Sequence, residues 1–510
     1  MLDDTIAAIA TPLGEGGLAV IRLSGPAAIA VADRCFAPSG RSATPLAQAH
    51  THTLHYGHVV RDHQRVDEVL VALMRAPRTY TRQDVIEISC HGGLLPARLV
   101  LEAVLAAGAR LARPGEFTQR AFLNGRLDLA QAEAVADLIH ARTALSLRAA
   151  NEQLAGKLSR RIQQLRDQLM LTLAHVEAHL DFPDEDIAPD TGGQLIARLK
   201  HGVEFMDTLL RTAHEGQLLR RGVRAVIVGR PNAGKSSLLN QLLGHDRAIV
   251  TAIPGTTRDT IEETADIRGL PVVFIDTAGL REAGDEIEVE GIRRSRVALE
   301  RADLVLQVLD ASQPLTESEL KPLGGASGCK RILVLNKSDL PDGLSPAEIA
   351  AALSGSRHDA QVPPGSHEPE RREVRSSGFS RLRGPQPAKA GTPNELRLMG
   401  STPAAVPVIP ISCLTGEGLE TLKDAIKEAV WAGEIRAEML EVMLNARHQD
   451  AVRRARDSVQ RAIGSLRAGE GLELIAAELR LATNAVGEVV GQTTTEDLLD
   501  AIFSQFCLGK

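Results

Sequence analysis

The amino-acid sequence predicts a multidomain protein in which an α+β N-terminal domain precedes an α/β domain that has helical segments on both sides. A chain of 510 residues is too long for one hydrophobic core. Short β-like runs are mixed with helical patterns before residue 120, whereas continuous apolar runs follow residue 220. Helical patterns lie before and after that second region, so we expect them to pack together as one bundle.

Residues 1–120 are expected to form the α+β domain. Runs with high β propensity lie at residues 18–23, 69–73 and 85–89, and a helical pattern covers residues 97–107. Histidines cluster in the same region, but their spacing fits no common zinc site, so we expect no metal there. They are His50, His52, His55, His58 and His63.

Residues 121–219 and 433–510 are expected to form the two parts of an all-α domain. Apolar side chains between residues 158 and 176 recur at steps of three and four, as on the buried stripe of a bundle helix. These residues are Leu158, Ile162, Leu165, Leu169, Leu173 and Val176. The polar segment 181–186 is expected to be a turn between two such helices.

Residues 220–432 are expected to form the α/β domain. Its apolar runs, such as RAVIV at 224–228 and RILVL at 331–335, each end in a polar loop. This is typical of a doubly wound sheet whose strand tips carry the ligand site. Residues 354–405 interrupt the pattern because they are rich in serine, glycine, proline and arginine, and we expect a disordered, solvated insertion there.

Composition excludes several classes of protein. The net charge of −7 argues against a globally basic nucleic-acid binder, and the aromatic content of 2% argues against stacking platforms for single-stranded nucleic acid. The scattered cysteines fit a reducing compartment. The first residues lack the basic start of a signal peptide, and no apolar stretch is long enough to span a bilayer. We therefore expect a cytoplasmic protein.

The segment GRPNAGKS at 229–236 has the pattern of a phosphate-binding loop between a strand and a helix. Its glycines allow backbone N–H groups to point at phosphates near the positive end of the helix. Lys235 is expected to reach the β- and γ-phosphates, and Ser236 to bind Mg²⁺. The nucleotide-binding residues predicted in this loop are Asn232, Ala233, Gly234, Lys235, Ser236 and Ser237.

The loop after RILVL indicates which base is bound. It contains Asn336, Lys337, Ser338 and Asp339. The Asp339 carboxylate can accept hydrogen bonds from both N1–H and the exocyclic amine of guanine, a donor pair that adenine lacks. Lys337 can lie along the plane of the base. Together with the phosphate loop, this segment predicts a GTP site.

The segment DTAG predicts how the metal and the γ-phosphate are held. Asp276 is expected to hold the Mg²⁺ shell, the Gly279 backbone to meet the γ-phosphate, and Thr257 to complete the magnesium site as a switch threonine. In Ras-type GTPases a glutamine after this glycine orients the attacking water, but here that position is Leu280. Either hydrolysis is slow or another group supplies the contact. The acidic loop 282–290 offers several carboxylates, and its sequence does not select one.

The chain resembles the MnmE (TrmE) family of tRNA-modification GTPases in motifs spread along nearly its whole length except the insertion. They are TIAAIATPLGEGG, YTRQDVIEISCHGG, ARPGEFTQRAFLNGRLDLAQAEAV, GRPNAGKSSLLN, PGTTRD, DTAGLREAGDEIEVEGI, NKSD and CLGK. The resemblance implies an N-terminal folate-binding and dimerisation domain and a discontinuous helical domain. It also implies that the α/β P-loop GTPase domain is inserted within that helical domain.

The resemblance implies a function in tRNA processing. Such proteins act as homodimers with the flavoprotein MnmG, in a heterotetramer-type complex. Together they add an aminomethyl or carboxymethylaminomethyl group to C5 of the wobble uridine of certain tRNAs. The one-carbon unit would come from 5,10-methylenetetrahydrofolate or 5-formyltetrahydrofolate, and the amine from glycine or ammonium.

The resemblance also implies that potassium-dependent dimerisation of G domains compensates for Leu280. The potassium ligands it implies are Asn232, Thr251, Ile253 and Thr256. Glu288 would orient the attacking water, and Arg281 in the same segment is a second catalytic candidate. Further residues expected to bind the nucleotide are Thr251, Ala252, Ile253, Pro254, Gly255, Thr256, Thr257, Asp276, Thr277, Ala278, Gly279, Ser412, Cys413 and Leu414.

For folate, the resemblance implies four binding residues and a neighbouring thiol. The binding residues are Arg22, Glu87, Arg126 and Lys510, and the thiol is Cys507, a candidate catalytic group. A carboxylate can pair with the amide and amine edge of a pterin, while cations can bind its glutamyl tail. For Cys507, a buried structural cysteine is the open alternative.

The chain departs from the family pattern near this site. Arg82 and Gln83 stand where Gly-Glu is usual, so we expect a changed turn there. Arg126 stands where lysine is common, which keeps the charge but changes the geometry.

Two alternative functions are a ribosome-assembly GTPase and a regulatory switch or scaffold without chemistry of its own. Ribosome-assembly GTPases usually carry an RNA-binding module with a GxxG loop or a second G domain, and neither is found in this sequence. Loss of wobble-uridine modification when Lys510 or Cys507 is replaced, with GTPase activity intact, would argue against a pure switch or scaffold.

Overall fold

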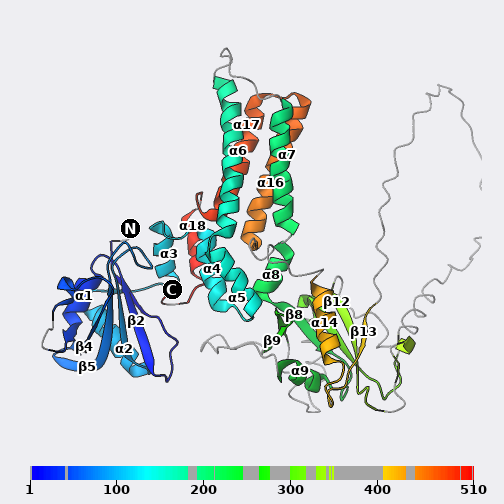
Figure 1. Ribbon diagram of the computed structural model, residues 1–510, viewed down its shortest axis with the longest axis horizontal. Coiled ribbons are helices and arrows are strands. Elements are labelled where there is room, and N and C mark those ends of the chain that lie inside the picture. The colour runs from blue at the N-terminus through cyan, green and yellow to red at the C-terminus, as the bar shows by residue number, and fades with distance from the viewer. Residues whose placement is uncertain are drawn as a thin grey trace, which may run out of the picture. The chain divides into compact units, whose positions relative to one another are not determined.

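The computed structural model describes two compact units of the chain (Figure 1). The first contains Met1–Val223, Asp246–Val273 and Trp431–Lys510, and the second contains Arg224–His245 and Phe274–Val430. The residues described are 3–40, 44–181, 192–211, 213–244, 263–275, 299–316, 329–340, 344–345, 347–349, 406–431, 443–493, 495–507 and 509. The expected insertion at 354–405, and the expected turn at 181–186 after its first residue, lie outside them.

The N-terminal part of the first unit is a seven-stranded sheet with the strand order β3-β4-β5-β6-β2-β1-β7. The strands are β1 (Ile6–Ile9), β2 (Leu18–Ser24), β3 (Phe36–Pro38), β4 (Thr53–Arg61), β5 (Gln64–Met74), β6 (Val85–His91) and β7 (Arg110–Leu111). The three predicted β runs lie in β2, β5 and β6, which confirms them. Side chains alternate between the two faces, so Val69 and Val71 are buried whereas Leu70 is 47% exposed.

Helices α1 (Ala28–Cys35) and α2 (Leu94–Ala106) cover one face of this sheet. Ile29 of α1 and Val104 of α2 share a core with Ile21 and Ile88 of the sheet. The helix predicted at 97–107 is therefore confirmed as α2. Large apolar side chains remain exposed on the sheet, and they are Leu18, Leu54, Tyr56, Leu70 and, on the edge strand β7, Leu111.

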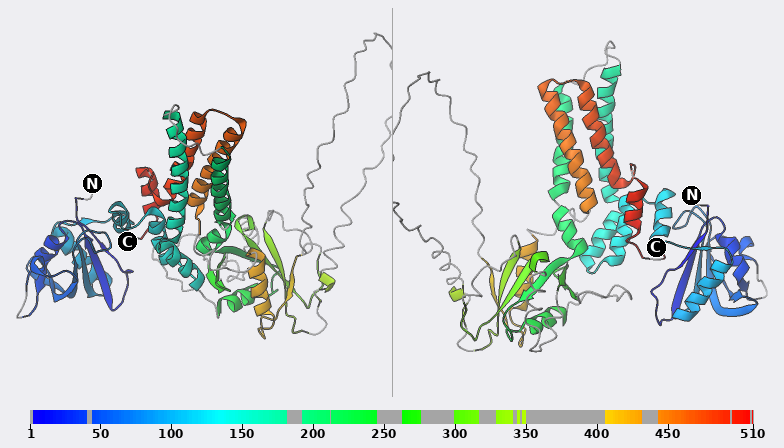
Figure 2. Two further views of the ribbon diagram at one scale, coloured as in Figure 1. Left: turned by 45° about the horizontal axis from the view of Figure 1, so that its top comes forward. Right: turned by 180° about the vertical axis from the view of Figure 1, so that it is seen from behind.

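Long helices from two separate stretches of sequence form a bundle, with their axes side by side in each view (Figures 1 and 2). They are α6 (Lys157–Asp181), α7 (Gly192–Arg211), α16 (Ala446–Ala468) and α17 (Leu472–Val490). The predicted stripe of α6, from Leu158 to Val176, is buried in the bundle core with Val452 and Leu479. This confirms the discontinuous all-α domain, because the chain between α7 and α16 contains the α/β sheet.

Shorter helices lie near one end of the bundle (Figure 1). They are α3 (Glu116–Leu123), α4 (Leu129–His140), α5 (Ala144–Leu154), α8 (Ala213–Arg221) and α18 (Glu496–Phe503). A capping box starts α4, since the Asp128 side chain accepts from the Gln131 N–H while the Gln131 side chain accepts from the Asp128 N–H. Asn445 and His448 cap α16 in the same way.

The α/β part contains a six-stranded sheet with the order β13-β12-β11-β8-β10-β9. Its strands are β8 (Val223–Val228), β9 (Glu263–Ile267), β10 (Leu270–Phe274), β11 (Leu304–Asp310), β12 (Lys330–Asn336) and β13 (Val408–Pro410). β8, β11, β12 and β13 are parallel, and the almost continuous burial of β11 and β12 is typical of such sheets. Helices α9 (Lys235–Gly244) and α14 (Leu419–Val430) accompany them, which confirms the α/β class.

Among the described helices, none has both the length and the apolar character required to cross a membrane.

Candidate functional site

The predicted phosphate loop lies between β8 and α9, as its motif requires. Apolar residues of β8 hold the strand in the sheet, and buried Leu238, Leu239 and Leu242 anchor α9. Residues 229–234 therefore lead directly into the N-terminus of a helix, where free N–H groups and the helix dipole favour an anion. Ser236 and Ser237 are exposed in the first turn of α9, and Asn232 is exposed in the loop with φ of 63°.

Lys235 folds back over this loop. Its ammonium Nζ donates to the backbone oxygens of Gly229 at 3.0 Å and Arg230 at 2.7 Å. Burial lowers the pKa of Lys235. A phosphate group in the loop would compensate for this loss of solvation, because it supplies negative charge close to the ammonium.

Asn336 joins three of the predicted segments. Its side-chain Nδ2 donates to the Ala233 carbonyl of the phosphate loop at 2.9 Å. Its Oδ1 accepts from the backbone N–H of Cys413 at 3.2 Å. Asn336 is only 2% exposed, so both hydrogen bonds are buried. They hold the phosphate loop, residues 336–339 and residues 412–414 together.

The loop after β12, which is predicted to recognise guanine, is also held in place. The Ser338 N–H donates to Ile411 at 3.1 Å, and the Gln241 side chain of α9 donates to the Cys413 carbonyl at 2.9 Å. Asp339 and Leu414 are exposed, so their side chains are accessible to a ligand. Lys337 has φ of 65° and its Nζ lies 2.6 Å from Oδ2 of Asp310, the last residue of β11.

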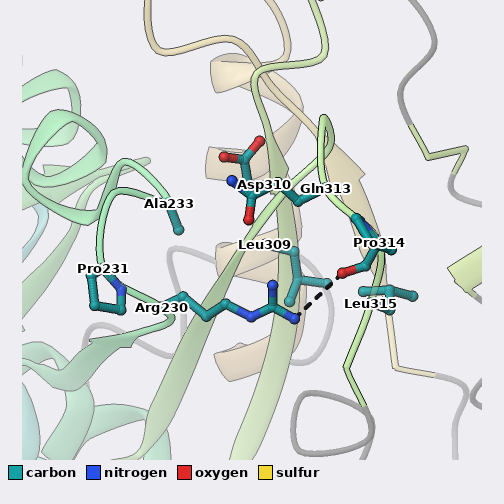
Figure 3. A pocket seen from close by; sticks show the side chains of 8 residues that line it. All are labelled: Arg230, Pro231, Ala233, Leu309, Asp310, Gln313, Pro314 and Leu315. Carbon is teal, nitrogen blue, oxygen red and sulfur yellow. Dashed lines mark hydrogen bonds between the residues drawn. The ribbon is translucent and has the colours of Figure 1, made fainter.

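The segment after β11 lies on the other side of a pocket from the phosphate loop (Figure 3). Arg230 of the phosphate loop reaches across to the Pro314 carbonyl at 3.4 Å and to the Thr316 hydroxyl at 2.7 Å. These contacts give the phosphate loop lateral support from residues 314–316 as well as support from Asn336.

Several predicted site residues lie outside the described residues. They are Thr251, Ala252, Ile253, Pro254, Gly255, Thr256, Thr257, Asp276, Thr277, Ala278, Gly279, Arg281, Glu288 and Lys510. Their roles therefore stay predictions.

A second cluster contains three of the four residues expected to bind folate, namely Arg22, Glu87 and Arg126. Arg22 of β2 and Glu87 of β6 are paired in register, and Nε of Arg22 donates to Oε1 of Glu87 at 2.8 Å. The Arg22 guanidinium also lies 5.9 Å from the Tyr80 ring centroid and 5.8 Å from that of Phe117. Arg126, which lies between α3 and α4, also stacks on Tyr80. Its guanidinium is 4.7 Å from the ring centroid and donates to the Tyr80 carbonyl at 3.0 Å. Cations, a carboxylate and aromatic rings thus meet in one place.

Residues far along the chain reach the same cluster. Nη1 of Arg22 donates to the Gly509 carbonyl at 3.1 Å, and the Gly115 N–H donates to the Cys507 carbonyl at 3.4 Å. Cys507 is half-buried and free. It lies two residues before Gly509, whose carbonyl accepts from Arg22, and its role beside folate stays a prediction.

The departures from the family pattern have visible consequences. Arg82 has φ of 58°, a left-handed conformation that glycine adopts without cost, and its guanidinium donates to the Asn124 carbonyl at 3.0 Å. Arg82 thus takes a backbone conformation that suits glycine, and its side chain ties this turn to the residue that follows α3. Gln83 Oε1 accepts from Ser24 at 3.1 Å and from the buried Arg120 at 3.2 Å.

Comparison with known proteins assigns the family. Residues 5–126 match the model described as the GTP-binding protein TrmE N-terminus, and residues 129–507 match the MnmE helical domain. The chain belongs to the MnmE family of tRNA modification GTPases. This confirms the resemblance found in the sequence and the predicted enzyme class, a GTP hydrolase.

Relatives named tRNA modification GTPase MnmE match this chain from end to end. The protein of Chloroflexus aurantiacus is 44% identical over 511 residues, which cover 100% of both chains. That of Geobacillus kaustophilus is 42% identical over 99% of both chains. That of Bacillus subtilis is 40% identical over 99% of this chain and all of its own.

Some residues at the sites of this MnmE-family chain were not predicted. Asp310, Gln241 and Arg230 support the nucleotide loops, and Tyr80 and Phe117 form the aromatic part of the Arg22 cluster. A signal for Asp310 was present, because an acid ends the apolar run DLVLQVLD next to the strand that leads into NKSD. Tyr80 begins the quoted motif YTRQD, but its position beside Arg22 depends on strand pairing.

Proposed function

We propose that this chain hydrolyses GTP and, with the flavoprotein MnmG as partner, modifies C5 of the wobble uridine of certain tRNAs in the cytoplasm. The proposal rests on one observation above others. In a chain of the MnmE family, Asn336 holds the phosphate loop against both segments expected to recognise guanine. An aminomethyl or carboxymethylaminomethyl group would be added with a one-carbon unit from tetrahydrofolate.

Nucleotide binding is assigned to the α/β domain. Lys235 and the N-terminus of α9 would hold the β- and γ-phosphates, and Ser236 would bind Mg²⁺ together with Thr257. Asp339 would accept the guanine N1–H and amine. The domain bounds proposed are 1–120, 121–219, 220–432 and 433–510, with the α/β domain inserted between the helical parts.

Hydrolysis would require help beyond the phosphate loop, because Leu280 cannot orient water. Glu288 is proposed to orient the attacking water, with Arg281 as a further candidate. Asn232 is exposed in the loop, which suits it as a potassium ligand beside Thr251, Ile253 and Thr256. A monovalent cation there supplies positive charge where negative charge develops between the β- and γ-phosphates.

Folate binding is assigned to the Arg22 cluster. Glu87 can accept from the amide and amine edge of a pterin, the rings of Tyr80 and Phe117 can pack on its plane, and Arg126 and Lys510 can bind the glutamyl tail. Tetrahydrofolate supplies a one-carbon unit when bound. Cys507 lies near this cluster and is the proposed functional thiol.

A homodimer would place the folate cluster at an interface. The strand register puts Arg22, Glu87 and Ala72 in one row across the sheet, and Ser89, Leu70 and Tyr56 in the next. Directly opposed residues share a face, so the exposed apolar side chains lie on the same face as the Arg22 cluster. Covering this face with a second copy would bury the apolar side chains beside the proposed site.

The test is the variant Glu288→Ala. We expect GTP turnover of the unaltered chain to be much higher in potassium than in sodium, and turnover of the variant to fall by at least roughly 100-fold with GTP binding retained. In cells lacking this protein, the unaltered chain should restore wobble-uridine modification, measured by mass spectrometry of tRNA nucleosides, and the variant should not. A fully active variant, or turnover equal in both salts, would contradict the proposal.

A further inference from the structure

Asp310 belongs to none of the motifs that bind nucleotide, yet it faces one of them. It is the last residue of β11, and the register of β11 with β12 pairs Asp310 with Asn336. Lys337 directly follows Asn336 in the chain, so its backbone lies next to that of Asp310. Asp310 and Ala233 of the phosphate loop line the same pocket (Figure 3).

The Asp310 carboxylate is oriented by bonds on both of its oxygens. Oδ1 accepts from the backbone N–H of Ser312 at 3.0 Å and from the Ser312 hydroxyl at 2.7 Å. This leaves Oδ2 directed to the ammonium of Lys337, which lies 2.6 Å away. Burial opposes the charge, but the bonds from Lys337 and Ser312 outweigh it and lower the pKa of Asp310.

Lys337 is constrained at both ends as a result. Its backbone has φ of 65°, and its Nζ is held by a carboxylate whose side chain is only 9% exposed. A free lysine side chain samples many rotamers and loses that freedom when it packs on a ligand. The ion pair with Asp310 restricts that freedom, so the Lys337 stem has less of it to lose when it packs on a ligand.

We propose that Asp310 is a positioning residue for the guanine nucleotide, which holds the Lys337 stem where it lies along the base. The proposal rests on the proposed GTP site and deepens it. Asp339 reads the edge of the base, so it decides between guanine and other bases. Asp310 acts on the face of the base through Lys337, so it slows release of any purine nucleotide that Asp339 accepts.

The experiment measures dissociation of GDP carrying a fluorescent methylanthraniloyl group from the full chain, chased with unlabelled GDP in a stopped-flow instrument. In Asp310→Asn we expect dissociation to be roughly 10-fold faster, since the charged acceptor is replaced by a neutral one. Ser312→Ala, which loosens the carboxylate without removing it, should speed dissociation roughly two- to threefold. The control is Glu420→Gln, which removes a carboxylate 2.9 Å from Lys423 on the surface of α14 and should dissociate like the unaltered chain.

The double variant separates positioning from a general effect on the fold. In a Lys337→Ala background, Asp310→Asn should have little further effect on dissociation, because the residue it positions is gone. Equal acceleration in both backgrounds would overturn the proposal, as would an unchanged rate in Asp310→Asn. Failure of the unaltered chain to bind GDP would instead overturn the proposed GTP site. If Asp310→Asn does not fold, Ser312→Ala in the two backgrounds decides in the same way.

Discussion

Gly234 and Asn336 illustrate how the nucleotide site depends on contacts of single residues. Gly234 has φ of 95°, and a Cβ built on it would collide with the Asn336 amide that holds the phosphate loop. The loop can therefore approach residue 336 only because residue 234 has no side chain. This close approach lets the Asn336 side chain bond to the Ala233 carbonyl, which joins the loop to the start of residues 336–339.

The change Gly234→Ala should reduce GDP affinity by roughly 100-fold, since it combines a strained backbone with loss of the Asn336 contact. Calorimetric titration with GDP measures the effect. Gly244→Ala is the matched control, because Gly244 ends the same helix and its Cβ would have no neighbour within 4 Å. Equal affinity of the two variants would contradict this account.

Residues of the site could be predicted from the sequence where their chemistry is local. Lys235 and Ser236 follow from an uninterrupted strand, loop and helix, and the structure places them at the start of α9. The pairing of Asp310 with Lys337 could not be predicted, because 27 residues separate them and their contact depends on β11 and β12 being neighbours. Arg22 and Glu87 were placed by resemblance, and their pairing arises from β2 lying beside β6.

At the level of elements, a buried charge cluster connects α4 to α16. Glu133 of α4 accepts two bonds from the Arg447 guanidinium, at 3.0 and 2.9 Å, and lies 2.7 Å from Nε2 of His448. Burial alone would raise the pKa of Glu133, but His448 and Arg447 outweigh it and hold that pKa well below its usual range. The cluster ties an early helix to the first turn of a helix that begins after the α/β sheet.

The change Glu133→Gln should lower the free energy of unfolding of the helical part by about 3 kcal/mol near pH 7, because it leaves the half-buried Arg447 without its charged partner. The pKa of Glu133 is near 4.5 in the unfolded chain and lower in the folded protein. Ionised Glu133 therefore contributes its full stabilisation above about pH 4.5, and this contribution is lost as the pH falls below that value. The difference between variant and unaltered chain should therefore shrink below about pH 4.5.

Urea unfolding followed by circular dichroism at several pH values measures this. Glu177→Gln is the control, since its pair with Arg480 lies on the bundle surface and should contribute less than about 1 kcal/mol. A pH-independent difference between Glu133→Gln and the unaltered chain would contradict the assignment of the effect to ionised Glu133.

Elements were predictable where burial imposes a clear period. The stripe of α6 and the apolar runs of β11 and β12 are such cases. β4 was not predicted, because its exposed face carries Leu54 and Tyr56 among histidines and obscures the alternation of polar and apolar residues. β9 was also missed, since Glu263 and Thr264 are buried polar residues in it.

At the level of the whole molecule, the open face of the N-terminal sheet bears on how many copies assemble. Leu18, Leu54, Tyr56 and Leu70 are 68%, 71%, 49% and 47% exposed. Exposed apolar side chains gathered on one face of a sheet are typical of an interaction surface. The dimer was expected from family resemblance alone, and this face could not have been found without the register of β4, β5 and β6.

The change Leu70→Asp should convert the proposed dimer into monomers, because it places a charge among the exposed apolar side chains of this face. Sedimentation velocity at micromolar concentration measures the result. Leu171→Asp on α6 is the control, because Leu171 is 65% exposed on the helical bundle and should not affect assembly. Monomers in the unaltered chain, or dimers in Leu70→Asp, would contradict assembly through this face.

The hydrogen bond between Arg22 and Gly509 also sets an order of events during synthesis. The two residues are separated by 487 positions, and ribosomes add roughly 5–20 residues each second. The N-terminal sheet can fold early, but its Arg22 must wait roughly 25–100 s for its distant partner to be made. The proposed folate cluster is therefore among the last parts of the nascent chain to be completed. Until Gly509 is made, Arg22 has Glu87 but not this backbone carbonyl as a partner.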